Sequence, residues 1–194
     1  VRVDGGYKGY NTDAIGLYRE LEEENIIIKD KEVIILGAGG ASNAITYICA
    51  DKGAAKIYLL NRTFDKAKKL ADDVNSHFGD VVVPLAISDY RLIPKGKYPV
   101  IQTTSCGLYP HNDDAPIYDK EFYELVEAGV DIIFNPAKTM FMKLCKESGA
   151  RAYNGLKMLL YQGIAAFELW NNIKVPKNLA DKILGMMERK LKES

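Results

Sequence analysis

The sequence has few of the residues that build metal centres and disulfide frameworks. It contains two histidines and three cysteines in 194 residues, and Cys49, Cys106 and Cys145 show no C-x-x-C spacing. An odd and widely spaced set is typical of reduced structural thiols in a cytoplasmic protein. We therefore expect no metal site. A nucleophilic Cys106 is disfavoured because no histidine is placed to activate it.

The sequence also lacks a charge imbalance and a long apolar run. Basic and acidic residues both number 26, so nothing points to a nucleic-acid partner. No apolar run approaches the ~18 residues of a membrane helix, and no signal peptide precedes the first strand-like residues. With 47% apolar residues, the chain can bury the core of one domain, or of one domain and a fragment. We expect a cytoplasmic protein without a membrane partner.

The stretch from Val33 to Ser42 combines a β-branched run with a glycine turn and the start of a helix. Gly37 and Gly39 fill the first two positions of G-x-G-x-x-G, Ser42 stands at the third, and Gly40 is additional. Such a turn lets main-chain amides approach a pyrophosphate at a helix N-terminus. The predicted contacts are Gly37, Ala38, Gly39, Gly40 and Ala41. A glycine turn that only joins a strand to a helix is the alternative.

Strand-like and helix-like segments alternate along the middle of the chain. We predict strands at 32–36, 55–60, 81–85, 99–102, 130–134 and 150–153, and helices at 13–25, 40–52, around 67–74, at 119–128 and at 139–148. This alternation is typical of an α/β fold with a doubly wound (Rossmann) parallel sheet of about six strands. Ligands of such folds bind at the carboxyl ends of the strands.

The two ends of the chain break this pattern. Residues 1–10 resemble a short hairpin around Asp4-Gly5-Gly6, and 156–172 and 176–191 are consecutive helical stretches without a strand between them. The chain opens in a strand without an initiator methionine, so we expect that something N-terminal is missing. We assign 1–12 to a remnant of a substrate domain, 13–155 to a Rossmann domain, and 156–194 to helices that pack on the mostly missing second domain.

A basic cluster follows the second predicted strand, where a ribose 2′-hydroxyl usually meets a carboxylate. Asn61-Arg62-Thr63 and Lys66 stand there instead. Arg62 can clamp a 2′-phosphate, Thr63 can cap the helix and donate to the phosphate, and Lys66 adds a positive charge. Two charge-assisted bonds of roughly 1.5–3 kcal/mol each favour NADP over NAD by at least ~100-fold. A capped helix with a solvated basic face is the alternative.

Other candidate site residues each have an ordinary structural interpretation beside the functional one. The loop after the fourth strand, with Thr103 and Ser105, can line the cofactor beside the nicotinamide or be an ordinary polar loop. Asp13 lies at a helix start, where aspartates commonly cap. Met158 and Gln162 lie four residues apart on one helix face, where Met is more often part of the core.

Five motifs occur in one order: Gly9-Tyr10-Asn11-Thr12-Asp13, Gly37 to Ser42, Asn61-Arg62-Thr63, Thr103 to Gly107, and Asn154 to Gln162. Together they closely resemble the shikimate dehydrogenase family, across essentially all of this chain and the later two-thirds of the family's length. The resemblance implies a two-domain oxidoreductase that reduces 3-dehydroshikimate to shikimate with NADPH in the cleft between its domains.

The resemblance also implies roles for individual residues. Asp13 matches the aspartate that binds a substrate hydroxyl and partners the catalytic lysine, and Gln162 matches a substrate-binding glutamine. The nicotinamide is expected near Ile132, Gly155 and Met158. Phe134 stands at a substrate-contacting position that is commonly Tyr, and Gln102 stands where the family usually has Asn. The catalytic lysine and two substrate-binding serines of the family lie upstream of Val1.

We therefore expect the chain alone to bind NADP(H) but to turn over little or no substrate. Two alternatives remain open: a quinate or shikimate dehydrogenase paralogue that uses NAD, and a non-catalytic NADP-binding module. The parent enzyme is expected to be a monomer or a homodimer.

Overall fold

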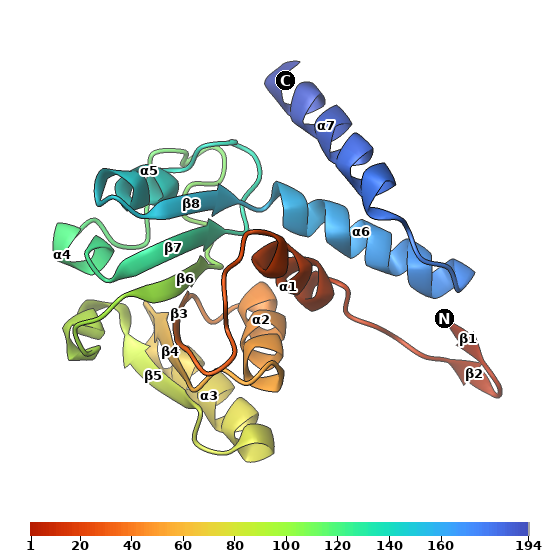
Figure 1. The fold of residues 1–194 in the computed structure, drawn as a ribbon. Helices are drawn as coiled ribbons and strands as arrows, with labels where there is room; N and C mark the ends of the chain where they lie inside the picture. The colour runs from red at the N-terminus through yellow and green to blue at the C-terminus, as the bar shows by residue number, and fades with distance from the viewer. Residues whose placement is uncertain (194) are drawn as a thin grey trace.

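The computed structural model of the chain describes residues 1–193 and contains a six-stranded parallel sheet with helices on both faces (Figure 1). The strands are β3 (Glu32–Leu36), β4 (Lys56–Asn61), β5 (Val82–Ala86), β6 (Tyr98–Gln102), β7 (Val126–Asp131) and β8 (Arg151–Asn154). Their order is β5-β4-β3-β6-β7-β8, and all pairs are parallel. The chain therefore reverses direction across the sheet between β3 and β6. This confirms the predicted Rossmann fold and puts the crevice for a ligand at that junction.

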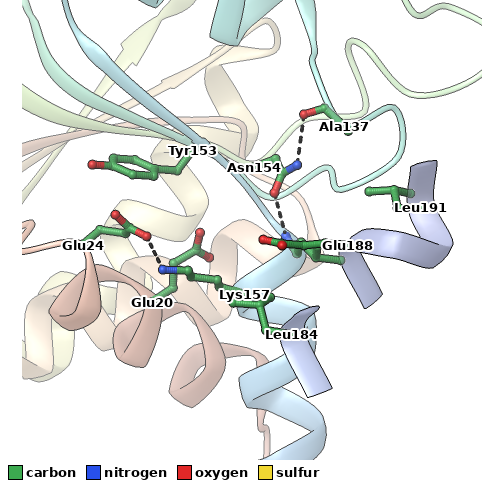
Figure 2. Close-up of a pocket in the computed structure, with 10 residues that line it drawn as sticks. Glu20, Glu24, Ala137, Tyr153, Asn154, Lys157, Leu184, Glu188 and Leu191 are labelled. Atoms are coloured by element: carbon green, nitrogen blue, oxygen red, sulfur yellow. Dashed lines mark hydrogen bonds and ion pairs between the residues drawn. The ribbon is translucent and has the colours of Figure 1, made fainter. Parts of the chain in front are cut away.

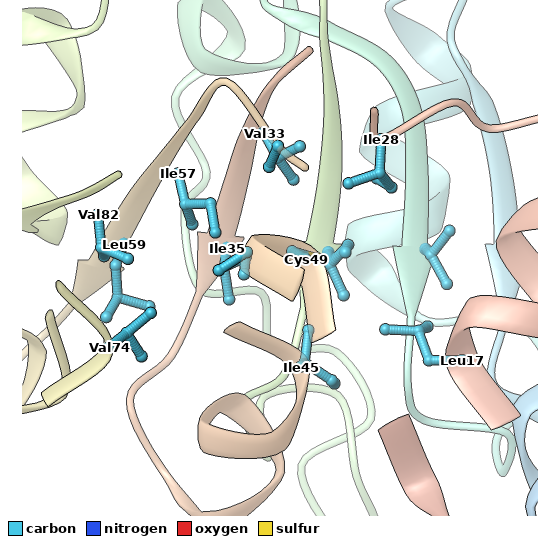
Figure 3. Packing of buried hydrophobic residues seen from close by; sticks show 14 of the residues in the cluster. Leu17, Ile28, Val33, Ile35, Ile45, Cys49, Ile57, Leu59, Val74 and Val82 are labelled. Carbon is cyan, nitrogen blue, oxygen red and sulfur yellow. The ribbon is translucent and has the colours of Figure 1, made fainter. Parts of the chain in front are cut away.

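Each face of the sheet has its own helices and apolar core. The helices on one face are α1 (Asp13–Glu23), α2 (Gly40–Asp51) and α3 (Phe64–Phe78), and those on the other are η1 (Ile87–Leu92), α4 (Lys120–Tyr123) and α5 (Met140–Glu147). Ile35 packs with Ile45 and Cys49 on the first face (Figure 3), whereas Leu36 packs on the second. Because both faces are covered, β3 has no exposed residue, and its residues 33–36 form a continuous apolar run after the half-buried Glu32.

The predictions for residues 119–134 were wrong in detail. The expected helix at 119–128 is limited to α4, and the expected strand at 130–134 is β7, which begins four residues earlier. Glu127 is exposed between buried Val126 and Ala128, and a Cβ on Gly129 would lie 2.7 Å from Cys145 Sγ under α5. The two neighbouring strands pair with 126–131 and override its moderate helix propensity.

The two ends of the chain lie to one side of the sheet (Figure 1). β1 (Arg2–Val3) and β2 (Gly6–Tyr7) form the expected hairpin, and α6 (Leu156–Asn171) and α7 (Lys177–Glu193) are consecutive helices. Ser194 lies outside the described residues. α6 and α7 share a small apolar cluster, yet Phe167 and Trp170 are 47% and 73% exposed. Among the described residues, no helix is long and apolar enough to cross a membrane.

Candidate functional site

The glycine turn after β3 is held by close backbone packing. Gly37 has φ of +110°, and a Cβ there would lie 2.6 Å from Thr103 Oγ1. The Gly37 amide donates to Leu60 O at 2.7 Å, and the Ser42 hydroxyl donates to Gly37 O at 2.6 Å. Ser42 is fully buried. The serine at the third motif position therefore stabilises the turn through a buried hydrogen bond to Gly37.

The N-terminus of α2 is open next to this turn. Gly39 and Gly40 are exposed, and a Cβ on either would meet no atom within 4 Å. No side chain caps this helix, and Ala38 and Ala41 are half-buried. Free main-chain amides at the positive end of a helix bind anions such as a pyrophosphate. The geometry therefore fits the predicted cradle.

The loop after β6 forms the opposite wall of the crevice. The Thr103 amide and hydroxyl both donate to Leu36 O, at 2.8 and 2.7 Å, which ties this loop to the end of β3. The Thr103 hydroxyl is therefore used within the protein. Ser105 is exposed. Of the Thr103 and Ser105 hydroxyls, the Ser105 hydroxyl is therefore the one available to a ligand.

The basic cluster stands at the end of β4, beside the glycine turn. Asn61 Nδ2 donates to Thr63 O at 2.8 Å, which shapes the loop. Thr63 is at the N-cap of α3 but its side chain makes no capping bond, so that part of the prediction was wrong. Arg62 and Lys66 are exposed, and within residues 1–193 neither has a carboxylate within 4 Å. A lysine in a first helical turn opposes the helix dipole, so an anionic ligand would stabilise this arrangement.

A second group of candidates meets where α1 crosses α6. A Cβ on Gly16 would lie 2.6 Å from Met158 O and 2.8 Å from Gln162 N, so the two helices touch through their backbones. Thr12 Oγ1 donates to Gln162 Oε1 at 3.5 Å. The helix start bearing Asp13 therefore lies beside Gln162. Asp13 is exposed, and its carboxylate has no partner among the described residues.

The turn between β8 and α6 packs against the segment after β7. Gly155 N donates to Ile133 O at 3.1 Å, and a Cβ on Gly155 would lie 2.1 Å from Ile132 O. Ile132 and Met158 pack in the same apolar cluster. The three residues predicted near a nicotinamide thus lie together. Phe134, predicted at a strand end, lies in a loop and is 38% exposed.

A buried carboxylate that the sequence did not reveal joins two of these loops. Asp131 Oδ1 accepts from Gln102 Nε2 at 3.2 Å and from Ile133 N at 3.0 Å, and Oδ2 accepts from the Thr139 hydroxyl at 2.6 Å. Gln102 also bonds Cys106 O and Thr104 N. The long glutamine side chain therefore spans from Asp131 to the loop after β6. Burial raises the pKa of Asp131 to about 6 despite the three hydrogen bonds that oppose this.

Asp131→Leu is expected to lower the free energy of unfolding by about 3 kcal/mol, because it leaves the buried Ile133 amide and Thr139 hydroxyl without an acceptor and leaves Gln102 Nε2 with Cys106 O alone. Asp131→Asn should cost less, since its oxygen can accept two of these bonds. The raised pKa predicts that stability from Asp131 falls as pH rises from about 4 to about 6, because the unfolded state releases this proton first. Urea denaturation at several pH values between about 4 and about 6 should show that the free energy of unfolding depends less on pH in Asp131→Asn than in the unsubstituted chain. An unchanged midpoint for Asp131→Leu would contradict this role, and exposed Asp113→Leu is the control.

The chain matches two family models and many curated proteins. The model described as shikimate / quinate 5-dehydrogenase matches residues 20–88, and that of the shikimate 5′-dehydrogenase C-terminal domain matches residues 155–182. The NADP(+) shikimate dehydrogenase of Carboxydothermus hydrogenoformans is 38% identical over 178 residues, which cover 92% of this chain and 63% of that protein. The chain thus spans less than two-thirds of the length of this relative.

Solved structures agree with the sequence matches. The shikimate 5-dehydrogenase of Listeria monocytogenes, in complex with shikimate and NAD, has a TM-score of 0.83 at 28% identity, covering 95% of this chain and 66% of that one. A shikimate dehydrogenase in complex with NADP+ has a TM-score of 0.79 at 34% identity, covering 94% and 63%. With both family models and these structures in agreement, the chain belongs to the shikimate dehydrogenase family.

Proposed function

We propose that this chain is the NADP-binding part of a shikimate dehydrogenase, which reduces 3-dehydroshikimate to shikimate. One observation carries the proposal: an open amide cradle at Gly39 and Gly40, after β3, lies beside Arg62 and Lys66, two cations after the adjacent β4 that have no carboxylate partner among residues 1–193. The first suits a pyrophosphate and the second a 2′-phosphate. The name of the Carboxydothermus relative, which specifies NADP(+), supports the same cofactor.

In this proposal the cofactor extends across the crevice from β4 to α6. The pyrophosphate contacts residues 37–41, and the nicotinamide lies near Ile132, Gly155 and Met158, with Ser105 and the Thr103 backbone on the other wall. Asn61 and Thr63 shape the loop that carries Arg62. When bound, NADPH supplies the hydride that reduces the substrate carbonyl.

The substrate-facing residues lie at the junction of α1 and α6. The Asp13 carboxylate accepts a hydrogen bond from a substrate hydroxyl, and the Gln162 amide, held beside Thr12, binds a second substrate oxygen. Phe134 offers only an apolar ring at a position where a tyrosine would add one hydrogen bond of about 0.5–1.5 kcal/mol. Asp13 also orients a lysine proton donor, the role that the family resemblance implies for this aspartate.

We further assign residues 13–155 to the cofactor domain, and residues 1–12 and 156–194 to the substrate-domain side. Support comes from the apolar side chains that this side exposes: Tyr7, Phe167, Trp170, Ile173, Leu179 and Met186. Exposed apolar groups of this number mark an interaction surface.

Calorimetry on the 194-residue chain tests the cofactor assignment. NADP+ is expected to bind, and shikimate-dependent NADP+ reduction by this chain alone is expected to be slow or absent. Absence of NADP+ binding would contradict the proposal. Tighter binding of NAD+ than of NADP+ would favour the NAD-dependent alternative, and ordinary turnover would show that residues 1–194 contain their own proton donor.

A further inference from the structure

Glu20 is a buried acid on α1 that the proposed chemistry does not use. Its side chain is 1% exposed, and Oε2 accepts the Met158 amide of α6 at 3.0 Å. Gly155, the N-cap residue of α6, has no side chain that could cap this helix, and Asn154 Oδ1 accepts the Leu156 amide at 3.2 Å. Glu20 therefore binds a free amide in the first turn of α6 from a helix far away in the sequence. Its Oε1 is buried and has no partner among the described residues.

The charged groups around Glu20 are mostly engaged with one another. Lys157 pairs with Glu23 at 2.8 Å and also with Glu24, and the Tyr161 hydroxyl donates to Glu23. Glu24 and Glu20 line a cavity of about 500 Å³ together with Glu188 of α7 (Figure 2). Glu20, Glu24 and Glu188 thus face this cavity, the Lys157 ammonium is shared between Glu23 and Glu24, and Lys177 lies 3.3 Å from Glu23.

This environment disfavours a charge on Glu20. Burial raises its pKa to about 8, and Glu24 and Glu23 add to the shift, while the Met158 amide and Lys157 oppose it. The neutral carboxyl group still accepts the Met158 amide through its carbonyl oxygen. An ionised group would be a buried charge with one hydrogen bond, which is a costly state that water entry or movement of the α6 turn relieves.

We propose that Glu20, through the hydrogen bond that it accepts from the Met158 amide, is a positioning residue that holds the first turn of α6 against α1 and thereby shapes the nicotinamide side of the cofactor site. This role builds on the proposed function. Met158 lies on that turn, Gln162 lies one turn further on, and Asp13 lies on α1. The Glu20 carboxyl group is thus a buried part of the helix contact on which all three depend. A purely structural carboxyl would affect stability without distinguishing the two halves of the cofactor.

The test compares NADPH with adenosine 2′,5′-bisphosphate, which carries the 2′-phosphate but no nicotinamide. If only the protein with neutral Glu20 is competent, about one-tenth is competent at pH 9, so NADPH affinity should fall about tenfold between pH 7 and pH 9. Affinity for the bisphosphate should stay constant over this range, since the group acts only on the nicotinamide side. Fluorescence titration measures both.

Glu20→Gln should retain the pH 7 affinity for NADPH at both pH values, because its amide oxygen accepts the Met158 amide without ionising. Glu22→Gln, on the exposed side of α1, should behave as the unsubstituted chain. The same pH dependence in Glu20→Gln as in the unsubstituted chain, or an equal fall for the bisphosphate, would overturn the role of Glu20. Failure of the unsubstituted chain to bind the bisphosphate would contradict the proposed function itself, and this role with it.

Discussion

Replacing Gly155 by alanine is expected to lower the free energy of unfolding by about 4 kcal/mol. The added Cβ would lie 2.1 Å from Ile132 O and 2.5 Å from Ile132 C, and no rotation of a side chain can relieve contacts with backbone atoms. Overpacking a core costs about 1–3 kcal/mol, occasionally more, and loss of the hydrogen bond from Gly155 N to Ile133 O adds about 1–3 kcal/mol. Urea denaturation followed by circular dichroism measures the change.

The matched control for this substitution lies on the same helix. Gly163 of α6 is exposed, and a Cβ there would meet no atom within 4 Å. Gly163→Ala is therefore expected to raise stability by up to about 1 kcal/mol, the difference in helix propensity. If Gly155→Ala and Gly163→Ala gave similar stabilities, the packing of α6 against the segment after β7 would have to differ from that described here.

The strand at 32–36 and the turn after it show why part of the site could be predicted from the sequence. The strand at 32–36 and its glycine turn are local features, since an unbroken β-branched run followed by glycines has few other structures available. Alternation of strands and helices then restricts the topology to a doubly wound sheet. The predicted sheet was confirmed because each of these signals lies within about ten residues along the chain.

The segment 119–134 was predicted less well because its structure depends on distant partners. Glu121, Glu124, Leu125 and Glu127 favour a helix by propensity, but 126–131 pairs with β6 on one side and β8 on the other. Gly129 accommodates α5 at a distance that only glycine allows. Tertiary pairing overrides a weak local preference in such a case.

The sequence patterns did not predict the two buried acids either, because their burial also depends on residues that lie far away in the sequence. Glu20 precedes a run of acidic residues, Glu22 to Glu24, that is typical of an exposed helix end, and it accepts the amide of Met158, which lies 138 positions away. Asp131 and Gln102 are 29 positions apart and meet only when β6 and β7 pair. By contrast, Arg62 and Lys66 were singled out because their positions follow directly from the end of β4, and their role in binding NADP stays a prediction.

Replacing both Arg62 and Lys66 by alanine is expected to lower NADPH affinity by at least ~100-fold, since two charge-assisted hydrogen bonds contribute about 1.5–3 kcal/mol each. Affinity for NADH should not change, because it has no 2′-phosphate for these side chains to bind. Both side chains are exposed and make no hydrogen bond or ion pair among residues 1–193, so the urea midpoint of unfolding should not change. Calorimetric titration of the double variant with each cofactor gives the two affinities.

Lys69→Ala is the matched control, since it removes the same charge from an exposed position one turn further along α3. Its effect should be smaller than that of the double variant, because the proposed site gives Lys69 no direct hydrogen bond to the 2′-phosphate and salt weakens its remaining charge interaction. Raising the salt concentration should weaken NADPH binding by the unsubstituted chain and leave the double variant almost unaffected, since only the former uses these exposed cations. An equal loss of affinity for NADPH and NADH in the double variant would mean that Arg62 and Lys66 support the loop after β4 rather than bind a 2′-phosphate, and the NADP preference would then need another origin.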